Sequence, residues 1–366
     1  MVRLELEAIL RQYWFHRRTT VKYFYRNVVA TPVQVTMVPA LSLDPARLRD
    51  TYRKATSMLY NTYFSYRHRP DQNVMAEDWD NLLILDSCRF NLFARKNTID
   101  GDLESRMRFV THSRHFLENH FADEQFHDTV YVTGNANVSL LEDGTFHAIV
   151  PVQIDRIENK QKYRDTEAGS VLPAESNAVW PEDVVSAAID AYERFPEKRL
   201  IVHFMQPHEP FIGPKGLDLY RRYMESRDGN DESKSYSQKK HGEIFGVNWY
   251  NLFRDNESDI TEEEAIAAYE ENFELVLESV EELLSAVPGK TVLTADHGEM
   301  LGERLLPITP KLYGHGGRAK TLPLCKVPWH VVEGDSRRPI TAEPPVESER
   351  MDMETVEKQL TALGYN

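Results

Sequence analysis

Two short apolar runs that each end in an aspartate constrain the fold of this chain more than any other feature. They are NLLILD, which spans Asn81–Asp86, and KTVLTAD, which spans Lys290–Asp296. Apolar runs of this length, bounded by polar residues, predict strands that are buried on both faces. Such strands belong to a parallel sheet that helices cover on each side.

Further segments alternate between strand and helix patterns, as this architecture requires. The expected strands continue with Thr129–Thr133, Arg199–Met205 and Val327–Val332. The expected helices are His112–Phe121, a helix that begins after Pro181, and a long helix over Thr261–Val287 that opens on a capping box. We therefore predict an α/β fold of three layers, α/β/α, with a central and mostly parallel sheet.

Composition narrows the classes of function. With 41% hydrophobic residues in 366, the chain can bury a large core, and its formal charge of −15 disfavours a nucleic acid as the main partner. Two cysteines, Cys88 and Cys325, cannot form a disulfide framework or a thiolate zinc cluster and suit a reducing compartment. Because neither a signal-peptide pattern nor an apolar run of membrane-spanning length is evident, we expect a cytoplasmic protein.

The N-terminal residues differ in charge from the rest. Residues 1–26 carry six basic and two acidic side chains, and residues 11–27 interleave aromatic residues with cations. This composition suits a peripheral contact with the inner face of a membrane, or a helix packed on the core with its Arg stems extended to solvent. We expect a helical, basic and aromatic extension over 1–75, a catalytic domain over 76–335, and an acidic tail with a short helix over 336–366. A polar insertion, 225–259, either borders the site or is an inert surface loop.

The strand-terminal acids indicate a metal site. In an open α/β sheet, ligands bind beyond the carboxyl ends of the strands. Asp86 and Asp296 both lie there, and His297 follows Asp296 directly. Two carboxylates and an imidazole suit Mn²⁺ or Zn²⁺ better than Ca²⁺ or Mg²⁺. A single aspartate at such a position could simply cap the next helix, but two with an adjoining histidine favour the metal site.

Four segments resemble a known family in its order. TVLTADHGEMLGE, preceded by a helix of the form YxxNxxxVLxxVxxLL, resembles the metal-site segment of the sulfatase-like branch of the alkaline phosphatase superfamily. NLLILDSCRFNLF, HFMQPHEPF and KLYGHGGRAKTLPLCKVPWHVV resemble its first strand, its substrate-facing His segment and its late His-Gly segment. The resemblance implies an alkaline phosphatase-like fold and a phosphoric or sulfuric ester hydrolase or phosphotransferase.

Carried over residue by residue, the resemblance implies that Asp86, Asp296 and His297 hold a divalent metal. It also implies that His208 and His315 contact the transferred group or the leaving oxygen, or complete a second metal site. Alternatively, each is an ordinary loop or turn histidine. His203, inside a strand, is expected to be satisfied within the core.

The nucleophile is harder to place. The C-x-P-S-R motif of formylglycine sulfatases is absent, so an arylsulfatase is disfavoured and phosphate is favoured over sulfate. Relatives that transfer phosphoryl groups use Ser or Thr at a helix start, which here lies in FVTHSRHFLENHF. We rank Ser113 ahead of Thr111, although either could instead cap the helix.

Three cations near the site could bind an anionic ester. Arg89, one turn beyond Asp86, could hold the ester or form a structural ion pair. His112 and Arg114 flank the nucleophile segment and could bind substrate or be exposed. Asn91 and Gln206 stand where relatives often have acids, which favours one tightly held metal over two.

We therefore expect a metal-dependent hydrolase or transferase of a phosphate ester, acting on a substrate attached to an envelope lipid or glycan. Two other functions stay open. One is an inactive metal-binding scaffold in envelope or glycan assembly, and the other is a two-metal phosphomutase or phosphodiesterase of the same superfamily. The sequence does not indicate the oligomeric state.

Overall fold

The structure, a computed structural model, describes residues 45–152, 179–228, 259–307, 309–315 and 319–346. The chain divides into two compact units, Met1–Arg53 and Lys54–Asn366. The sheet, the helices that cover it and the candidate site all belong to the second unit. The predicted membrane-contacting residues 11–27 and the predicted C-terminal helix lie outside the described residues, as does most of the predicted insertion 225–259.

A seven-stranded sheet forms the centre of this unit, in the order β2-β9-β6-β1-β5-β3-β4. Five neighbouring strands are parallel, β9 runs antiparallel to β6, and β2 runs antiparallel to β9. The strands are β1 (Asn81–Leu85), β2 (Asp102–Met107), β3 (Phe126–Thr133), β4 (Phe146–Pro151), β5 (Arg199–Phe204), β6 (Thr291–Thr294) and β9 (Lys326–Val332). Two further strands, β7 (Met300–Glu303) and β8 (Leu312–Gly314), pair with each other in a separate small sheet.

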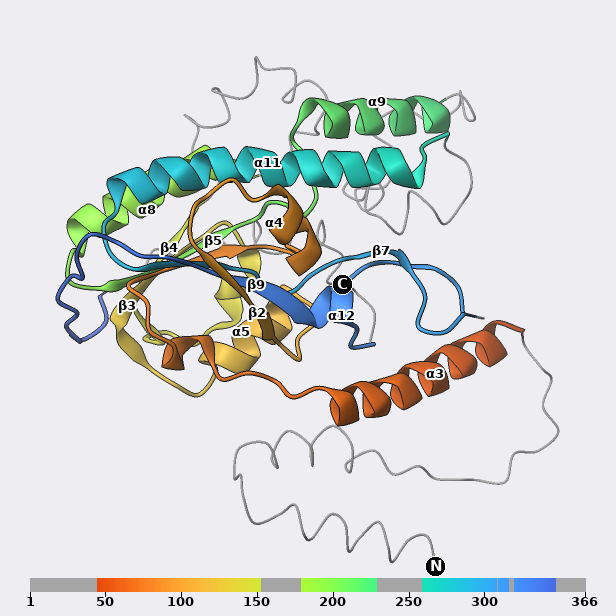
Figure 1. The fold of residues 1–366 in the computed structure, drawn as a ribbon, viewed down its shortest axis with the longest axis horizontal. Coiled ribbons are helices and arrows are strands. Elements are labelled where there is room, and N and C mark those ends of the chain that lie inside the picture. Colours follow the sequence, from red (N-terminus) through yellow and green to blue (C-terminus); the bar gives the residue numbers. More distant parts are fainter. Residues whose placement is uncertain (1–44, 153–178, 229–258, 308, 316–318, 347–366) are drawn as a thin grey trace, which may run out of the picture. The chain divides into compact units, whose positions relative to one another are not determined.

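Helices lie on both sides of the sheet, with α8 and α11 on one side and α5 on the other (Figure 1). The helices are α3 (Pro45–Arg67), α4 (Phe90–Lys96), α5 (Ser113–Phe121), α8 (Pro181–Arg194), α9 (Pro214–Asp228), α11 (Glu262–Ala286) and α12 (Leu322–Cys325). Two short 3₁₀ helices are η2 (Val74–Ala76) and η3 (Ala136–Leu140). No helix in the described part of the chain is long and apolar enough to span a membrane.

The two faces of the sheet bury alternate residues of each strand. In β1, Leu83 and Leu85 pack in the core under α8 and α11, whereas Leu82 and Ile84 pack in the core under α5. This alternation follows from the two-residue period of a strand, and it fills both cores from a single apolar run. The structure confirms the predicted three-layer α/β class with a mostly parallel central sheet.

Each strand and helix predicted between residues 81 and 332 is present with slightly shifted ends. The long helix α11 begins after Thr261, whose hydroxyl accepts from the Glu264 amide while the Glu264 carboxylate accepts from the Thr261 amide. Its reciprocal capping satisfies amide groups that the first turn would otherwise leave unpaired. Strands β2 and β4, at the two edges of the sheet, are not predicted from the sequence, nor is the hairpin of β7 and β8.

Candidate metal centre and nucleophile

The two strand-terminal acids lie side by side because their strands are neighbours. Strand β1 pairs in parallel with β6, and Ile84 is opposite Thr294. Asp86 and Asp296, each two residues further on, therefore reach the same carboxyl edge of the sheet. Both side chains are fully buried, with 1% and 0% exposure.

These acids and His297 form the first ligand group. One donor atom from each lies within 4.8 Å of the others. His297 Nε2 is 3.6 Å from Asp86 Oδ1 and 3.4 Å from Asp296 Oδ2. The structure thus brings together the three residues that the sequence resemblance implies as metal ligands.

A second ligand group lies next to the first. It consists of His208, Glu299 and His315, whose donor atoms again lie within 4.8 Å of one another. His315 Nδ1 is 3.1 Å from Glu299 Oε2, and the His315 ring centroid is 4.6 Å from that of His297. The His315 ring of the second group therefore lies beside the His297 ring of the first.

Glu299 is a candidate ligand that the sequence reasoning missed. It is the Glu of the DHGE string, three residues after Asp296, and its side chain is fully buried. Burying a carboxylate costs free energy unless it is paired, hydrogen-bonded or bound to a metal. An acid in the DHGE string, so close to Asp296 and His297, was therefore the signal that could have indicated Glu299 as a further donor. Asn91 and Gln206, whose uncharged side chains favoured a single metal, bind instead Arg89 and the Val179 carbonyl.

Orphaned polar atoms test whether these residues fit a metal. Asp296 Oδ2, His297 Nε2 and Glu299 Oε1 are buried and have no hydrogen-bond partner among the described residues. Such atoms destabilise a fold unless something else satisfies them. Their carboxylate and imidazole chemistry is what a divalent transition metal binds, so the residues present fit the implied metal.

Burial sets the charge of the groups at the site. Burial, together with the charge of Asp296, raises the pKa of Asp86 well above its usual range. Burial lowers the pKa of His297 to about 4 and that of His315 to about 3. For His208, burial opposes ionisation, but Glu209, Asp86 and Glu299 outweigh it and raise the pKa to about 9.

Ser113 is the hydroxyl that reaches the first ligand group. It is the first residue of α5, it is 2% exposed, and its Oγ donates to Asp86 Oδ2 at 3.2 Å. His112 is the N-cap, with its Nδ1 accepting from the His115 amide, so neither hydroxyl of the segment serves as the cap. Thr111 is buried two residues before the helix.

Two residues that the sequence reasoning did not single out hydrogen-bond the two acids. Asn135, just after β3, donates from Nδ2 to Asp86 Oδ2 at 2.9 Å. Ser87 has φ of 61°, which is uncommon for a residue with a side chain and places its amide 3.1 Å from Asp296 Oδ1. The turn after β1 therefore links the two acids directly.

Helix α11 anchors the loops that carry both ligand groups. Tyr269 donates from its hydroxyl to the Ser87 carbonyl at 2.7 Å, beside the first group. Asn272, one turn later, donates from Nδ2 to the His208 carbonyl at 3.0 Å and accepts from the Ile212 amide at 3.0 Å. These contacts give the YxxN pattern of the sequence a structural role.

The predicted substrate-binding cations divide into two kinds. Arg89 is 8% exposed and pairs with Glu303 at 2.7 Å, and His112 caps α5 at the edge of the first group. Arg114 lies elsewhere: its exposed guanidinium pairs with Glu118 along α5, at 3.0 Å. The structure thus does not bring Arg114 to the ligand groups.

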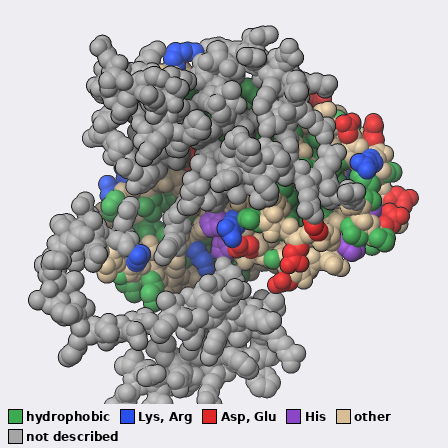
Figure 2. Space-filling model, turned by 180° about the vertical axis from the view of Figure 1, so that it is seen from behind, with side chains coloured by type: hydrophobic (Ala, Val, Ile, Leu, Met, Phe, Trp, Pro, Cys, Tyr) green, Lys and Arg blue, Asp and Glu red, His purple; other side chains and the backbone are tan. Residues whose placement is uncertain are grey.

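Figure 2 shows histidines beside acidic and basic side chains at the centre of one face of the described surface.

His203 departs from the expectation of a satisfied core histidine. Its Nδ1 lies 2.8 Å from the Tyr131 hydroxyl, but its Nε2 has no hydrogen-bond partner among the described residues. That nitrogen lies 3.9 Å from Asp86 Oδ2 and 3.8 Å from Asp296 Oδ2. His203 is therefore directed at the first ligand group from within the sheet.

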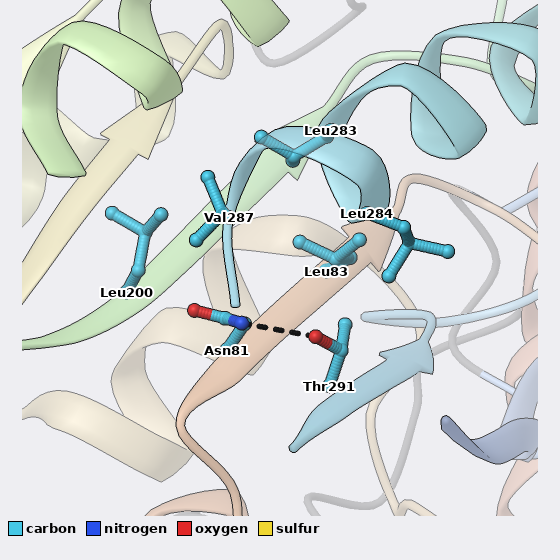
Figure 3. Close-up of a pocket in the computed structure, with 7 residues that line it drawn as sticks. All are labelled: Asn81, Leu83, Leu200, Leu283, Leu284, Val287 and Thr291. Atoms are coloured by element: carbon cyan, nitrogen blue, oxygen red, sulfur yellow. Dashed lines mark hydrogen bonds between the residues drawn. The ribbon is translucent and has the colours of Figure 1, made fainter. Parts of the chain in front are cut away.

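An apolar crevice lies at the opposite edge of the sheet. Its lining, drawn in Figure 3, is Asn81, Leu83, Leu200, Leu283, Leu284, Val287 and Thr291. Asn81 begins the strand that ends at Leu85, so this lining residue is about 16 Å from Asp86 at the rise of an extended strand. Its two polar lining residues bond each other, because Asn81 Nδ2 donates to Thr291 Oγ1 at 2.9 Å. The crevice belongs to the packing of α11 on the sheet.

Comparison with known proteins gives structural matches only. No protein-family model and no curated protein sequence matches the chain. The C-terminal periplasmic domain of EcEptC from Escherichia coli, in complex with Zn, is 13% identical, with a TM-score of 0.37 over 72% of this chain and 75% of that one. A protein in the alkaline phosphatase superfamily from Vibrio parahaemolyticus is 12% identical, with a TM-score of 0.36 over 88% and 76%. The phosphonate monoester hydrolase SpPMH from Silicibacter pomeroyi is 12% identical, with a TM-score of 0.35 over 80% and 73%.

Proposed function

We propose that this chain is a metal-dependent hydrolase or transferase that acts on a phosphate ester through Ser113. One observation carries the proposal: the buried Ser113 hydroxyl, at the start of α5, donates to Asp86 within a group of metal-type ligands. A hydroxyl so placed combines a helix N-terminus with a candidate cation site, and both favour its ionised form.

The first ligand group, Asp86, Asp296 and His297, would hold the metal. Oxygen and imidazole donors favour Zn²⁺ or Mn²⁺. A divalent cation supplies positive charge that stabilises the oxyanion of the nucleophile and the nonbridging oxygens of the ester. Ser87 and Asn135 keep the two acids in place through the hydrogen bonds described above.

The residues of the chain account for the remaining steps. The Ser113 proton leaves along its hydrogen bond to Asp86 as Oγ forms a bond to phosphorus and the bond from phosphorus to the ester oxygen breaks. His208, whose pKa is raised to about 9, donates a proton to the departing oxygen, and His315, whose pKa is about 3, contacts the transferred group instead. The phosphoserine then transfers its phosphoryl group to water or to an acceptor alcohol, which regenerates the Ser113 hydroxyl. A lipid- or glycan-linked substrate and a cytoplasmic location stay predictions from the sequence.

The experiment compares metal content and ester turnover. Purified protein and Asp296→Ala are analysed for bound metal and assayed with p-nitrophenyl phosphate, a phosphodiester and a sulfate ester, with added Zn²⁺ or Mn²⁺. We expect about one equivalent or more of metal that the variant loses, and turnover of a phosphate ester. Absence of metal under every condition would refute the enzymatic proposal, and turnover of the sulfate ester alone would reassign the substrate. Metal without turnover would favour the scaffold alternative.

The second ligand group favours a two-metal version of the same enzyme as the second candidate. The donor atoms of the second group, His208, Glu299 and His315, lie as close together as those of the first. The lack of acids at Asn91 and Gln206 favoured a single metal, but Glu299 supplies an acid to the second group. Metal titration decides between the two versions. Two equivalents, of which Glu299→Gln removes one, support the two-metal enzyme, whereas one equivalent that Glu299→Gln leaves in place supports the single-metal enzyme.

A further inference from the structure

A buried hydrogen bond between a tyrosine and a histidine lies within the sheet next to the first ligand group. Tyr131 on β3 and His203 on β5 face the same side of the sheet, with ring planes 4° apart and centroids 6.2 Å apart. The Tyr131 hydroxyl lies 2.8 Å from His203 Nδ1, and both side chains have 0% exposure. Neither residue belongs to the ligand groups or to the proposed chemical steps.

The tautomer of His203 follows from what its two ring nitrogens face. The Tyr131 hydroxyl, 2.8 Å from Nδ1, can donate a proton to that nitrogen, whereas Nε2 faces the carboxylates of Asp296 and Asp86 at 3.8 and 3.9 Å. Because ionised carboxylates only accept protons, the arrangement that points a proton at them has Tyr131 donating to Nδ1. A neutral imidazole carries its proton on the other nitrogen when one nitrogen accepts. His203 therefore carries its proton on Nε2.

That Nε2 proton faces the two acids, and the nitrogen has no hydrogen-bond partner among the described residues. The nitrogen is 3.8 Å from Asp296 Oδ2, an atom with no hydrogen-bond partner among the described residues. The other oxygen, Asp296 Oδ1, accepts from the amides of Ser87 and His297 at 3.1 and 2.8 Å. His203 thus approaches the one oxygen of Asp296 that is free for a metal, from the side of the sheet.

We propose that His203, fixed by Tyr131 as the tautomer protonated on Nε2, is a positioning residue that orients Asp296 and Asp86 for the metal. This inference rests on the proposed metal site. Carboxylate oxygens have lone pairs for more than one partner, so an N–H on the sheet side leaves the opposite side for the cation. Histidine and carboxylate groups behind the ligands of metal sites commonly set ligand orientation in this way.

The tautomer is tested on metal-free protein by nitrogen-15 NMR of labelled histidines. We assign the His203 ring signals by their loss in His203→Gln. We expect the pattern of a ring protonated on Nε2 in the wild type. In Tyr131→Phe, which removes only the hydroxyl, we expect a shift toward a mixture of tautomers. A wild-type ring protonated on Nδ1, or signals that Tyr131→Phe leaves unchanged, would overturn the inference. This measurement needs neither metal nor substrate.

Zn²⁺ affinity, measured by competition with a chelator, tests the positioning role. We expect His203→Leu to weaken binding by about 10- to 100-fold. His203→Gln, whose amide nitrogen reaches nearly the place of Nε2, should recover most of that loss. The control is His330→Leu, another buried strand histidine, which lies on β9 outside both ligand groups and should leave affinity within about twofold.

The outcomes separate the two proposals. If the wild-type protein and His203→Leu bind Zn²⁺ equally tightly, only the role of His203 is overturned. Wild-type protein that binds no Zn²⁺ overturns the proposed metal enzyme and, with it, this inference. If His203→Leu does not fold, as judged by circular dichroism, Tyr131→Phe replaces it, and an unchanged affinity in that variant together with His203→Gln would contradict the positioning role.

Discussion

Buried aspartates lie at both the amino edge and the carboxyl edge of the central sheet, where its strands begin and end, and the two edges give them different partners. At the amino edge, Asp80 is 1% exposed, and its Oδ2 accepts from Arg337 Nε at 2.6 Å and from the Lys290 amide at 2.8 Å. At the carboxyl edge, Asp86 and Asp296 are equally buried and have no Lys or Arg partner within the described ranges. The first edge pairs its acid with an arginine, whereas at the second edge two buried acids face each other without one.

This difference separates stability from function within one sheet. A buried acid with a cation and amide partners contributes to folding, because its charge is compensated. Buried acids that face each other without a Lys or Arg partner destabilise the metal-free fold and are retained for what they bind. The same residue type thus has opposite energetic effects at Asp80 and Asp86, which flank the two ends of β1.

The largest expected effect tests the chemistry of the carboxyl edge. Ser113→Ala should lower phosphate ester turnover by about 10³-fold or more, because it removes the attacking oxygen while leaving the ligands intact. Thr111→Val is the matched control and should retain activity within about tenfold. Steady-state rates on purified variants with equal metal content measure the effect. The opposite result, with Thr111→Val inactive and Ser113→Ala active, would transfer the role to Thr111.

A pair of substitutions tests the two edges directly. Asp80→Asn should lower the free energy of unfolding of the metal-free protein by about 2 kcal/mol, because Arg337 and the Lys290 amide lose a charged acceptor. Asp86→Asn should instead raise it by about 1 kcal/mol, because repulsion with Asp296 is relieved while an amide oxygen still accepts from Ser113 and Asn135. Urea unfolding at pH 7 in the presence of a chelator measures both. Equal destabilisation by the two variants would remove the contrast between the edges.

Helix α5 allows a pH test of buried polarity away from the ligand groups. Burial lowers the pKa of His120, in its last turn, to about 3. As the pH falls below about 6.5, the unfolded chain binds a proton that the folded protein does not, so His120 lowers stability by up to about 1.4 kcal/mol per pH unit. This loss continues until the pH reaches the folded-state pKa, and above pH 6.5 the effect is absent.

The measurement is the free energy of unfolding of wild type and His120→Gln between pH 4 and 7. The wild type should show the steeper fall, with a slope that differs by nearly one bound proton at pH 5. Parallel curves for the two proteins would show that His120 titrates normally in the folded state.

The smallest expected effect concerns Arg114, which lies on the outer surface of α5. Arg114→Ala should change the free energy of unfolding by no more than about 0.5 kcal/mol, because an exposed pair with Glu118 contributes little. It should also leave the KM of a phosphate ester within about twofold. A large rise in KM would show that Arg114 leaves Glu118 to bind substrate, as the sequence predicted.

The strands at the centre of the sheet are predictable from sequence because their apolar runs are buried on both faces, as in NLLIL and RLIVHF. Strand β2 (DLESRM) is an exposed edge strand whose side chains carry no such signal, and β4 needs β3 beside it to be distinguished from a loop. The direction of β9, antiparallel to β6, is likewise set by pairing across the sheet rather than by its own residues.

The candidate site divides in the same way. Asp86, Asp296 and His297 are found from sequence because strand ends and a local string identify them. Asn135 and the orientation of His203 depend on which strands become neighbours, and that information is not local in the sequence. Glu299 is intermediate: it lies in a recognisable string, but only its burial and its contact with His315 show it as a donor.

The anchoring of two loops by one turn of α11 has a consequence for redesign. Tyr269 and Asn272 are separated by a rise of about 4.5 Å along the helix axis, and each holds the backbone beside a different ligand group. A rigid helix therefore couples the spacing of the two groups to helical geometry rather than to loop length. Altering the separation of bound ions would require inserting or deleting residues within α11, whereas lengthening either loop alone would leave its anchored segment in place.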